Sequence, residues 1–141
     1  MTYQYPERVY GSKYQENMDI KDIAKEVRKA IKMDGFKFSV KIQRFSGGQS
    51  LKVRIKEVPD DFPMVAMKES WNGYGAQWQY SPELKELMDY IEAIINSYNY
   101  DGSDSMVDYF DVNFYGFVDV ESGSPAYDKL DAERELLFKA A

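Results

Sequence analysis

Histidine and cysteine, two side chains that often take part in catalysis and metal binding, are absent from this chain of 141 residues. Their absence excludes zinc fingers, thiol nucleophiles, disulfide scaffolds and the Ser-His-Asp relay. General acid–base catalysis would then need a carboxylate, lysine or tyrosine whose pKa is tuned by burial. No spacing in the sequence fixes two such groups in one cleft. We therefore expect a protein that is not an enzyme.

A polar loop between Tyr100 and Ser105 offers several oxygen ligands of the kind that calcium prefers. A helix–loop–helix calcium site needs acids at its first, third and fifth positions and a glutamate at its twelfth. Counted from Asp101, those later positions are Ser103, Ser105 and Val112. We interpret the loop as a turn whose Asp and Ser side chains cap their own backbone, and we expect neither a metal nor another cofactor.

The strongest candidate for a binding surface joins an aromatic loop to the acidic face of a predicted helix. Aromatic side chains are frequent anchors of protein interfaces. This candidate surface consists of Trp71, Tyr74, Trp78, Tyr80, Glu83, Glu86 and Glu92. The alternatives are that the tryptophans close one end of the core or stack on nucleic-acid bases, and that the glutamates serve only solubility.

Charge is divided unevenly along the chain, whose formal net charge is −6. The residues up to Val58 carry a net +6, whereas those from Pro59 onward carry −12. Such asymmetry is typical of proteins with charged partners, although two parts that pack together also neutralise one another.

Hydrophobic periodicity predicts two long helices. The first, over 19–34, has its apolar stripe at Ile20, Ile23, Ala24, Val27 and Ile31. Asp19 suits its N-cap, and Gly35 suits the left-handed residue that ends it. The second is expected to begin with Ser81 as N-cap and Pro82 at the first helical position. Its stripe is Leu84, Leu87, Met88, Ile91, Ile95 and Tyr98.

Period-two alternation around Gly47 and Gly48 predicts an antiparallel hairpin with one buried face. The buried parity contains Phe36, Phe38, Val40, Ile42, Leu51, Val53 and Ile55. The glycine pair suits a hairpin turn better than a phosphate-binding loop, which needs a helix directly after it. The solvent face would carry Lys37, Lys41, Lys52, Arg54 and Lys56.

Three further elements follow: a short helix after Asp61, a third strand over 109–120, and a final helix over about 127–139. On the third strand, the buried parity would be Phe110, Val112, Phe114, Val118 and Val120. Asp111 and Asp119 would lie beside the outward lysines and weaken their positive field. We therefore expect this sheet face to bind nucleic acid poorly.

The predicted order is α-β-β-(α)-α-β-α, an α+β two-layer sandwich whose helices cover one face of a three-stranded sheet. One core is expected to contain Phe38, Val40, Val53, Ile55, Ile91, Val112 and Phe114. A tyrosine-rich N-terminal arm over 1–17 would lie extended over a single domain at 18–141. No apolar run approaches the roughly 20 residues of a membrane span and no leader pattern opens the chain, so we expect a cytoplasmic protein without a membrane partner.

Motifs spread between Lys13 and Val120 carry a family resemblance. They are Lys13-Tyr14 before Asp19-Ile20-Lys21-Asp22-Ile23-Ala24, then Lys37-Phe38-Ser39-Val40, Arg44-Phe45-Ser46-Gly47-Gly48, and Tyr98-Asn99-Tyr100-Asp101-Gly102-Ser103-Asp104-Ser105 before Asp108-Tyr109-Phe110-Asp111-Val112. With these motifs the chain resembles a large polyvalent-protein-associated domain, which occurs in phages and conjugative elements. The resemblance implies a mobile-element origin and an accessory role when foreign DNA enters a cell. It implies no catalytic residues, and residues 59–82 lie outside it.

Two functions are compatible with these features. The favoured one is a non-enzymatic accessory protein of a mobile genetic element, of anti-restriction or anti-CRISPR type, which binds a protein partner through the candidate surface. The alternative is a KH-like nucleic-acid-binding module, because α-β-β-α-α-β is the element order of the type II KH module. Against it, Gly73-Tyr74-Gly75 lacks the Gly-x-x-Gly spacing and residues 71–80 contain no Lys or Arg, which makes nucleic acid the less favoured partner.

Overall fold

The computed structural model describes residues 2–68 and 77–140. In chain order the elements are strand β1 (Val9–Tyr10), helix α1 (Ile20–Ile31), strands β2 (Lys37–Phe45), β3 (Gly48–Glu57), β4 (Val65–Lys68) and β5 (Gln77–Tyr80), helix α2 (Pro82–Ser97), strand β6 (Tyr100–Asp101), the 3-10 helix η1 (Ser105–Val107), strand β7 (Tyr115–Val120) and helix α3 (Pro125–Ala140). Among the helices in these residues, none is long and apolar enough to cross a membrane.

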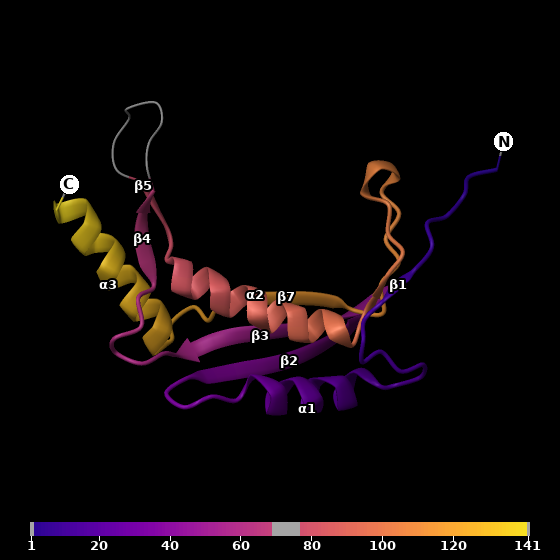
Figure 1. Cartoon of the computed structure of the whole chain (residues 1–141), viewed down its shortest axis with the longest axis horizontal. Helices are drawn as coiled ribbons and strands as arrows, with labels where there is room; N and C mark the ends of the chain where they lie inside the picture. Colours follow the sequence, from indigo (N-terminus) through magenta and orange to yellow (C-terminus); the bar gives the residue numbers. More distant parts are fainter. Residues whose placement is uncertain (1, 69–76, 141) are drawn as a thin grey trace.

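A three-stranded mixed sheet in the order β2-β3-β7 forms the centre of the molecule. β2 and β3 make the predicted antiparallel hairpin, and β7 lies parallel to β3. α1 packs against β2, α2 packs against β7, and the two helices touch one another, so both cover the same face of the sheet (Figure 1). This arrangement confirms the predicted α+β fold with helices on one face. α3 packs beside the end of β3.

Both long helices form where the apolar stripes predict them. Every stripe residue of α1 is buried, and Gly35 after the helix has a φ of 83° in the left-handed region that favours glycine. Asp19 stands at the N-cap of α1, but its carboxylate binds Arg44 at 2.8 Å and makes no capping hydrogen bond. α2 begins as expected, because the Ser81 hydroxyl accepts from the Leu84 N–H at 3.0 Å and Pro82 follows it.

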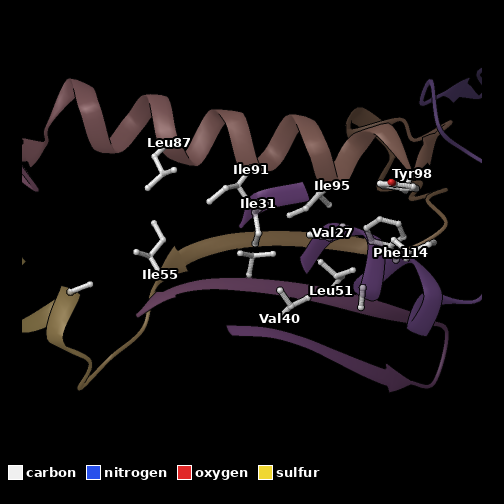
Figure 2. Close-up of a cluster of buried hydrophobic side chains, with 14 of the residues drawn as sticks. Val27, Ile31, Val40, Leu51, Ile55, Leu87, Ile91, Ile95, Tyr98 and Phe114 are labelled. Atoms are coloured by element: carbon white, nitrogen blue, oxygen red, sulfur yellow. The ribbon is translucent and has the colours of Figure 1, made fainter. Parts of the chain in front are cut away.

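A single hydrophobic core fills the space between the helices and the sheet. Leu87, Ile91 and Ile95 point from α2 toward the strands (Figure 2). Five of the seven residues predicted for this core are at most 8% exposed, namely Val40, Val53, Ile55, Ile91 and Phe114. Phe38 is half-buried and packs against the core. Val112 does not join it, because it pairs with Asp101 outside the main sheet.

The segment after Asp61 corrects the predicted short helix. It forms β4, which pairs antiparallel with β5 from Val65 opposite Tyr80 to Lys68 opposite Gln77. A short isolated helix is marginal in water, whereas pairing with β5 satisfies backbone groups of both strands. Within the described residues, the α-β-β-α-α-β order behind the KH comparison is therefore not present.

The third strand also begins later than predicted, at Tyr115. The alternation read over 109–120 fails in its first half, where Phe110 is 59% exposed. Residues 100–113, here called the finger, leave the sheet as a narrow hairpin in which Asp104 pairs with Tyr109 (Figure 1). Asp111 consequently lies on the finger and not on the lysine-bearing face of the sheet.

The N-terminal arm lies along the finger. Its strand β1 pairs antiparallel with β6. Arg8 binds the carboxylate of Asp111 through two hydrogen bonds of 2.8 and 3.1 Å, and its guanidinium carbon lies 4.1 Å from the centre of the Tyr100 ring. The Tyr3 hydroxyl donates to Asp104 at 2.5 Å. These contacts fasten the arm at several points along its length.

Candidate functional site

β7 forms one of the two edges of the central sheet, with β2 at the other, and its outer side is a free backbone edge. The Glu121 N–H donates to the Ile55 carbonyl at 3.0 Å, so the backbone groups of Glu121 turn toward β3. Successive residues of a strand turn these groups to opposite sides. Gly116, Val118 and Val120 therefore direct their N–H and C=O groups away from β3. Because β7 ends the strand order, these groups have no strand partner within the described residues.

A groove runs between this edge and α2, here called the edge groove. It consists of two adjoining hollows of about 380 and 670 Å³, which share Gly116 and Phe117. The smaller one is lined on the helix side by Lys85, Met88, Asp89 and Glu92. The larger one continues beyond Asn96 at the end of α2, under the N-terminal arm.

The larger hollow is mainly apolar and aromatic. Its walls include Val9, Tyr10, Tyr100, Val112, Tyr115 and Phe117. Asn99 fixes the wall between α2 and β7: its side-chain amide donates to the Phe114 carbonyl at 2.8 Å, and its side-chain carbonyl accepts from the Asn113 N–H at 3.0 Å. Glu7, Asp101 and Ser103 add polar groups to these walls. A hollow of this size that combines apolar walls with polar groups is typical of a binding site.

Gly116 sets the distance between α2 and β7. A Cβ atom at this position would lie 2.7 Å from Cγ2 of Ile95, which is closer than real contacts allow. Glycine therefore lets the helix pack directly on the strand while the backbone edge of β7 stays open. The rigid helix and the strand edge together define both walls of the groove.

The helix wall of the edge groove is mainly acidic. Lys85 also lines the groove and donates to the side chain of Gln79 at 3.2 Å. Asp89 and Glu92 are exposed, and neither forms an ion pair in the part of the chain that the structure describes. An extended segment entering the groove would meet their negative charge along one side.

The structure divides the surface predicted from Trp71, Tyr74, Trp78, Tyr80, Glu83, Glu86 and Glu92. Trp71 and Tyr74 lie outside the described residues. Glu83 and Glu92 are nine residues apart, and at 100° per residue they lie on opposite flanks of α2. Among the residues of this surface that the structure describes, only Glu92 borders the edge groove.

Trp78 and Tyr80 pack against other parts of the fold. Their ring centres lie 5.8 Å apart, and the guanidinium carbon of Arg134 on α3 lies 5.3 Å from the Trp78 ring. Both rings are half-buried against the core. For Trp78, this agrees with the alternative that the tryptophans close one end of the core.

The carboxylates of the acidic loop accept hydrogen bonds from the backbone of the same loop. Asp101 accepts from the Ser103 N–H at 2.8 Å, and Asp104 accepts from the Met106 N–H at 3.1 Å. Within residues 2–68 and 77–140, no three acidic side chains gather closely enough to hold a metal ion. The hydrogen bonds agree with the interpretation of this loop as a self-capping turn.

Little in the sequence indicates the edge groove. Its one local signal is Gly116, which interrupts the apolar parity of the third strand between Phe114 and Val118. The groove also requires β7 to occupy the edge of the sheet beside α2, which is a property of topology. No protein-family model, curated protein or solved structure matches this chain.

Proposed function

We propose that this protein is a non-enzymatic interaction module that binds an extended segment of a partner protein in the edge groove. The observation that carries the proposal is the open backbone edge of β7 beside α2. Unpaired N–H and C=O groups along a strand edge are a template for an added strand. The partner segment would become the fourth strand of the sheet.

The walls of the groove favour a particular kind of segment. The larger hollow suits an aromatic or branched apolar side chain, which would pack against Tyr115 and Phe117. Asp89 and Glu92 favour a lysine or arginine further along the segment. Side chains of an added strand alternate between its two faces, so an apolar residue on the face of Tyr115 and Phe117 and a basic residue facing α2 stand an odd number of positions apart.

The proposed protein partner is compatible with the mobile-element origin that the family resemblance implies. That origin, and an action against restriction or CRISPR nucleases, stay predictions. Under this proposal, such an action would require the target to present an extended basic segment or an accessible strand.

The test is a selection of displayed random peptides on the whole chain, followed by titration calorimetry of the enriched peptides. We expect peptides that carry an apolar residue and a Lys or Arg. Val118→Pro should weaken their binding by about tenfold or more, because proline removes an outward N–H without touching the ladder to β3. Val118→Thr keeps this N–H and should bind as the wild type does.

A charge reversal separates the two flanks of α2. Glu92→Lys should weaken basic peptides at least tenfold, whereas Glu83→Lys, an equal charge change on the opposite flank, should change binding less than twofold. Equal effects of both variants, or unchanged binding by Val118→Pro, would contradict the edge groove as the site. Dimers of the free protein that Val118→Pro dissolves would assign the edge to a second copy instead.

A further inference from the structure

The face of the sheet opposite the helices has a composition that the fold does not require. The cross-strand register arranges its side chains in rows across β2, β3 and β7. One row contains Lys41, Lys52 and Phe117, and the next contains Ser39, Arg54 and Asp119. Lys41 is exposed and Phe117 is 48% exposed, so this face is open to solvent. It is here called the open face.

Two lysines of the open face stand directly opposite one another. Lys41 pairs with Lys52 across β2 and β3. Like charges in this position destabilise a sheet. Within the described residues neither lysine has a carboxylate partner, and Lys52 instead lies 5.6 Å from the centre of the Phe117 ring. A bound anion would relieve this repulsion.

The acidic residues expected to neutralise the open face do so only in part. Asp111 lies on the finger, bound to Arg8. Asp119 remains and approaches Arg54 at 3.4 Å, which leaves Lys41 and Lys52 unneutralised by it. The net charge of −6 therefore hides a local positive strip.

Aromatic rings frame this positive strip. Phe45 and Tyr115 come from the two outer strands and stack with ring centres 6.1 Å apart. They meet above Gly48 of β3, where a Cβ atom would lie 3.2 Å from the Phe45 ring and 3.3 Å from the Tyr115 ring. Phe45 is 45% exposed. The open face thus offers two ring platforms, Phe45 with Tyr115 at one end and Phe117 beside the lysines.

We propose that the open face binds single-stranded nucleic acid. Its rings would stack on unpaired bases, and Lys41, Lys52 and Arg54 would contact the phosphates. Stacking on exposed rings combined with a positive groove is how proteins hold single strands without reading sequence. A duplex hides the faces of its bases, so it could use the lysines but not the rings. This proposal shares Tyr115 and Phe117 with the edge groove, but it does not require that a peptide binds there.

The test is fluorescence anisotropy of labelled 12-nucleotide dT and rU strands and of a 12-base-pair duplex, titrated with the whole chain. We expect micromolar binding of the single strands at 50 mM salt and at least tenfold weaker binding of the duplex. With about three phosphate contacts, the affinity should fall roughly 20-fold between 50 and 200 mM salt. Binding of either the dT or the rU strand, with the duplex at least tenfold weaker, supports the proposal.

Matched variants separate the open face from general charge. Lys41→Gln with Lys52→Gln should weaken binding at least tenfold and flatten the salt dependence. Lys21→Gln with Lys25→Gln removes the same charge from exposed positions on α1 and should change binding less than twofold. Phe117→Ala should weaken single-strand binding at least fivefold, and Phe117→Leu, which keeps more of the packing, should do the same if stacking is the cause.

Three results would overturn the proposal. The first is no binding of either single strand at 100 µM protein and 50 mM salt. The second is equal loss of affinity in the α1 and open-face lysine pairs, which would show non-specific charge attraction. The third is equal binding of single strand and duplex together with wild-type affinity in Phe117→Leu, which would exclude stacking.

Discussion

The two faces of the central sheet are made by alternate residues of the same strands, yet they differ in burial and in charge. On the helix-covered face, Leu51, Val53 and Ile55 of β3 are completely buried. On the open face of the same strand, Lys52 and Arg54 are only half-buried and carry charge. Burial of apolar surface stabilises the first face by about 25 cal/mol per Å² removed from water.

The difference shows which residues folding constrains. A smaller or polar side chain on the covered face would leave a cavity or an unsatisfied group in the core. On the open face, many polar residues would be compatible with the stability of the fold, whereas the facing pair Lys41 and Lys52 lowers it. Residues that folding does not need, and that cost some stability, are the ones to examine for binding.

The largest expected effect comes from comparing one phenylalanine on each side. Phe114 is 1% exposed, and Phe114→Ala should lower the free energy of unfolding by about 3–5 kcal/mol through lost burial and a cavity. Phe117 is 48% exposed, and Phe117→Ala should cost less than about 1 kcal/mol. Urea denaturation measures both. Equal losses would mean that Phe117 belongs to a covered surface.

A buried amide holds the covered face to the end of α2, and its loss should have an intermediate effect. Asn99 is 9% exposed, and its side chain makes hydrogen bonds to the backbone of Tyr100, Asn113 and Phe114. Asn99→Ala leaves these groups unsatisfied and should cost about 1–3 kcal/mol. Hydrogen exchange should show faster opening of β6 and the start of β7 than of the β2–β3 hairpin. Uniform acceleration across the sheet would count against a local anchor.

On the open face, removing a charge should stabilise the protein slightly. Lys41→Gln ends the repulsion with Lys52 and should raise the free energy of unfolding by about 0.2–1 kcal/mol at low salt. The gain should shrink as salt screens the two charges. Lys68→Gln on β4 serves as the control, since Gln77 and not a lysine faces Lys68 in the sheet register. A loss of stability in Lys41→Gln would show that its aliphatic stem packs on the sheet.

The smallest effect concerns a contact remote from both faces. The hydrogen bond to Asp104 raises the pKa of Tyr3 from 10.0 to about 12. A raised folded-state pKa means that this contact stabilises the docked arm below pH 10 and is lost as the pH rises from 10 to 12. Burial also raises the pKa of Tyr14, so ultraviolet titration should show late ionisation by more than one tyrosine, and Tyr3→Phe should reduce its amplitude by one tyrosine. An unchanged titration of Tyr3→Phe would assign the late ionisation to other tyrosines.

Local sequence signals predicted an element correctly where the contacts that form it lie within a few residues of the chain. The stripe of α1, the Ser81–Pro82 start of α2 and the Gly47 turn each depend on neighbours a few residues away, and all three are observed. The prediction that the third strand begins at residue 109 was wrong. Phe110 and Val112 continue the alternation of β7, but Asp104 pairs with Tyr109 within the finger, and the finger does not join β3. Alternation indicates that a segment is extended, but it does not indicate which strand the segment pairs with. The acidic flank of α2 was also misjudged, although helical spacing alone places Glu83 opposite Glu92.

The sequence by itself determined the α+β class, both long helices, the β2–β3 hairpin and the basic character of its outer face, because hydrophobic periodicity and turn residues act over short distances. The tertiary structure decided that β7 joins β3 in parallel at the edge of the sheet, that Gly116 meets Ile95, and that Asp111 leaves the open face for Arg8. These features depend on pairings between residues far apart in the chain, and their energies appear only when the layers are packed. Both candidate binding surfaces, the edge groove and the aromatic frame of the open face, are products of that packing.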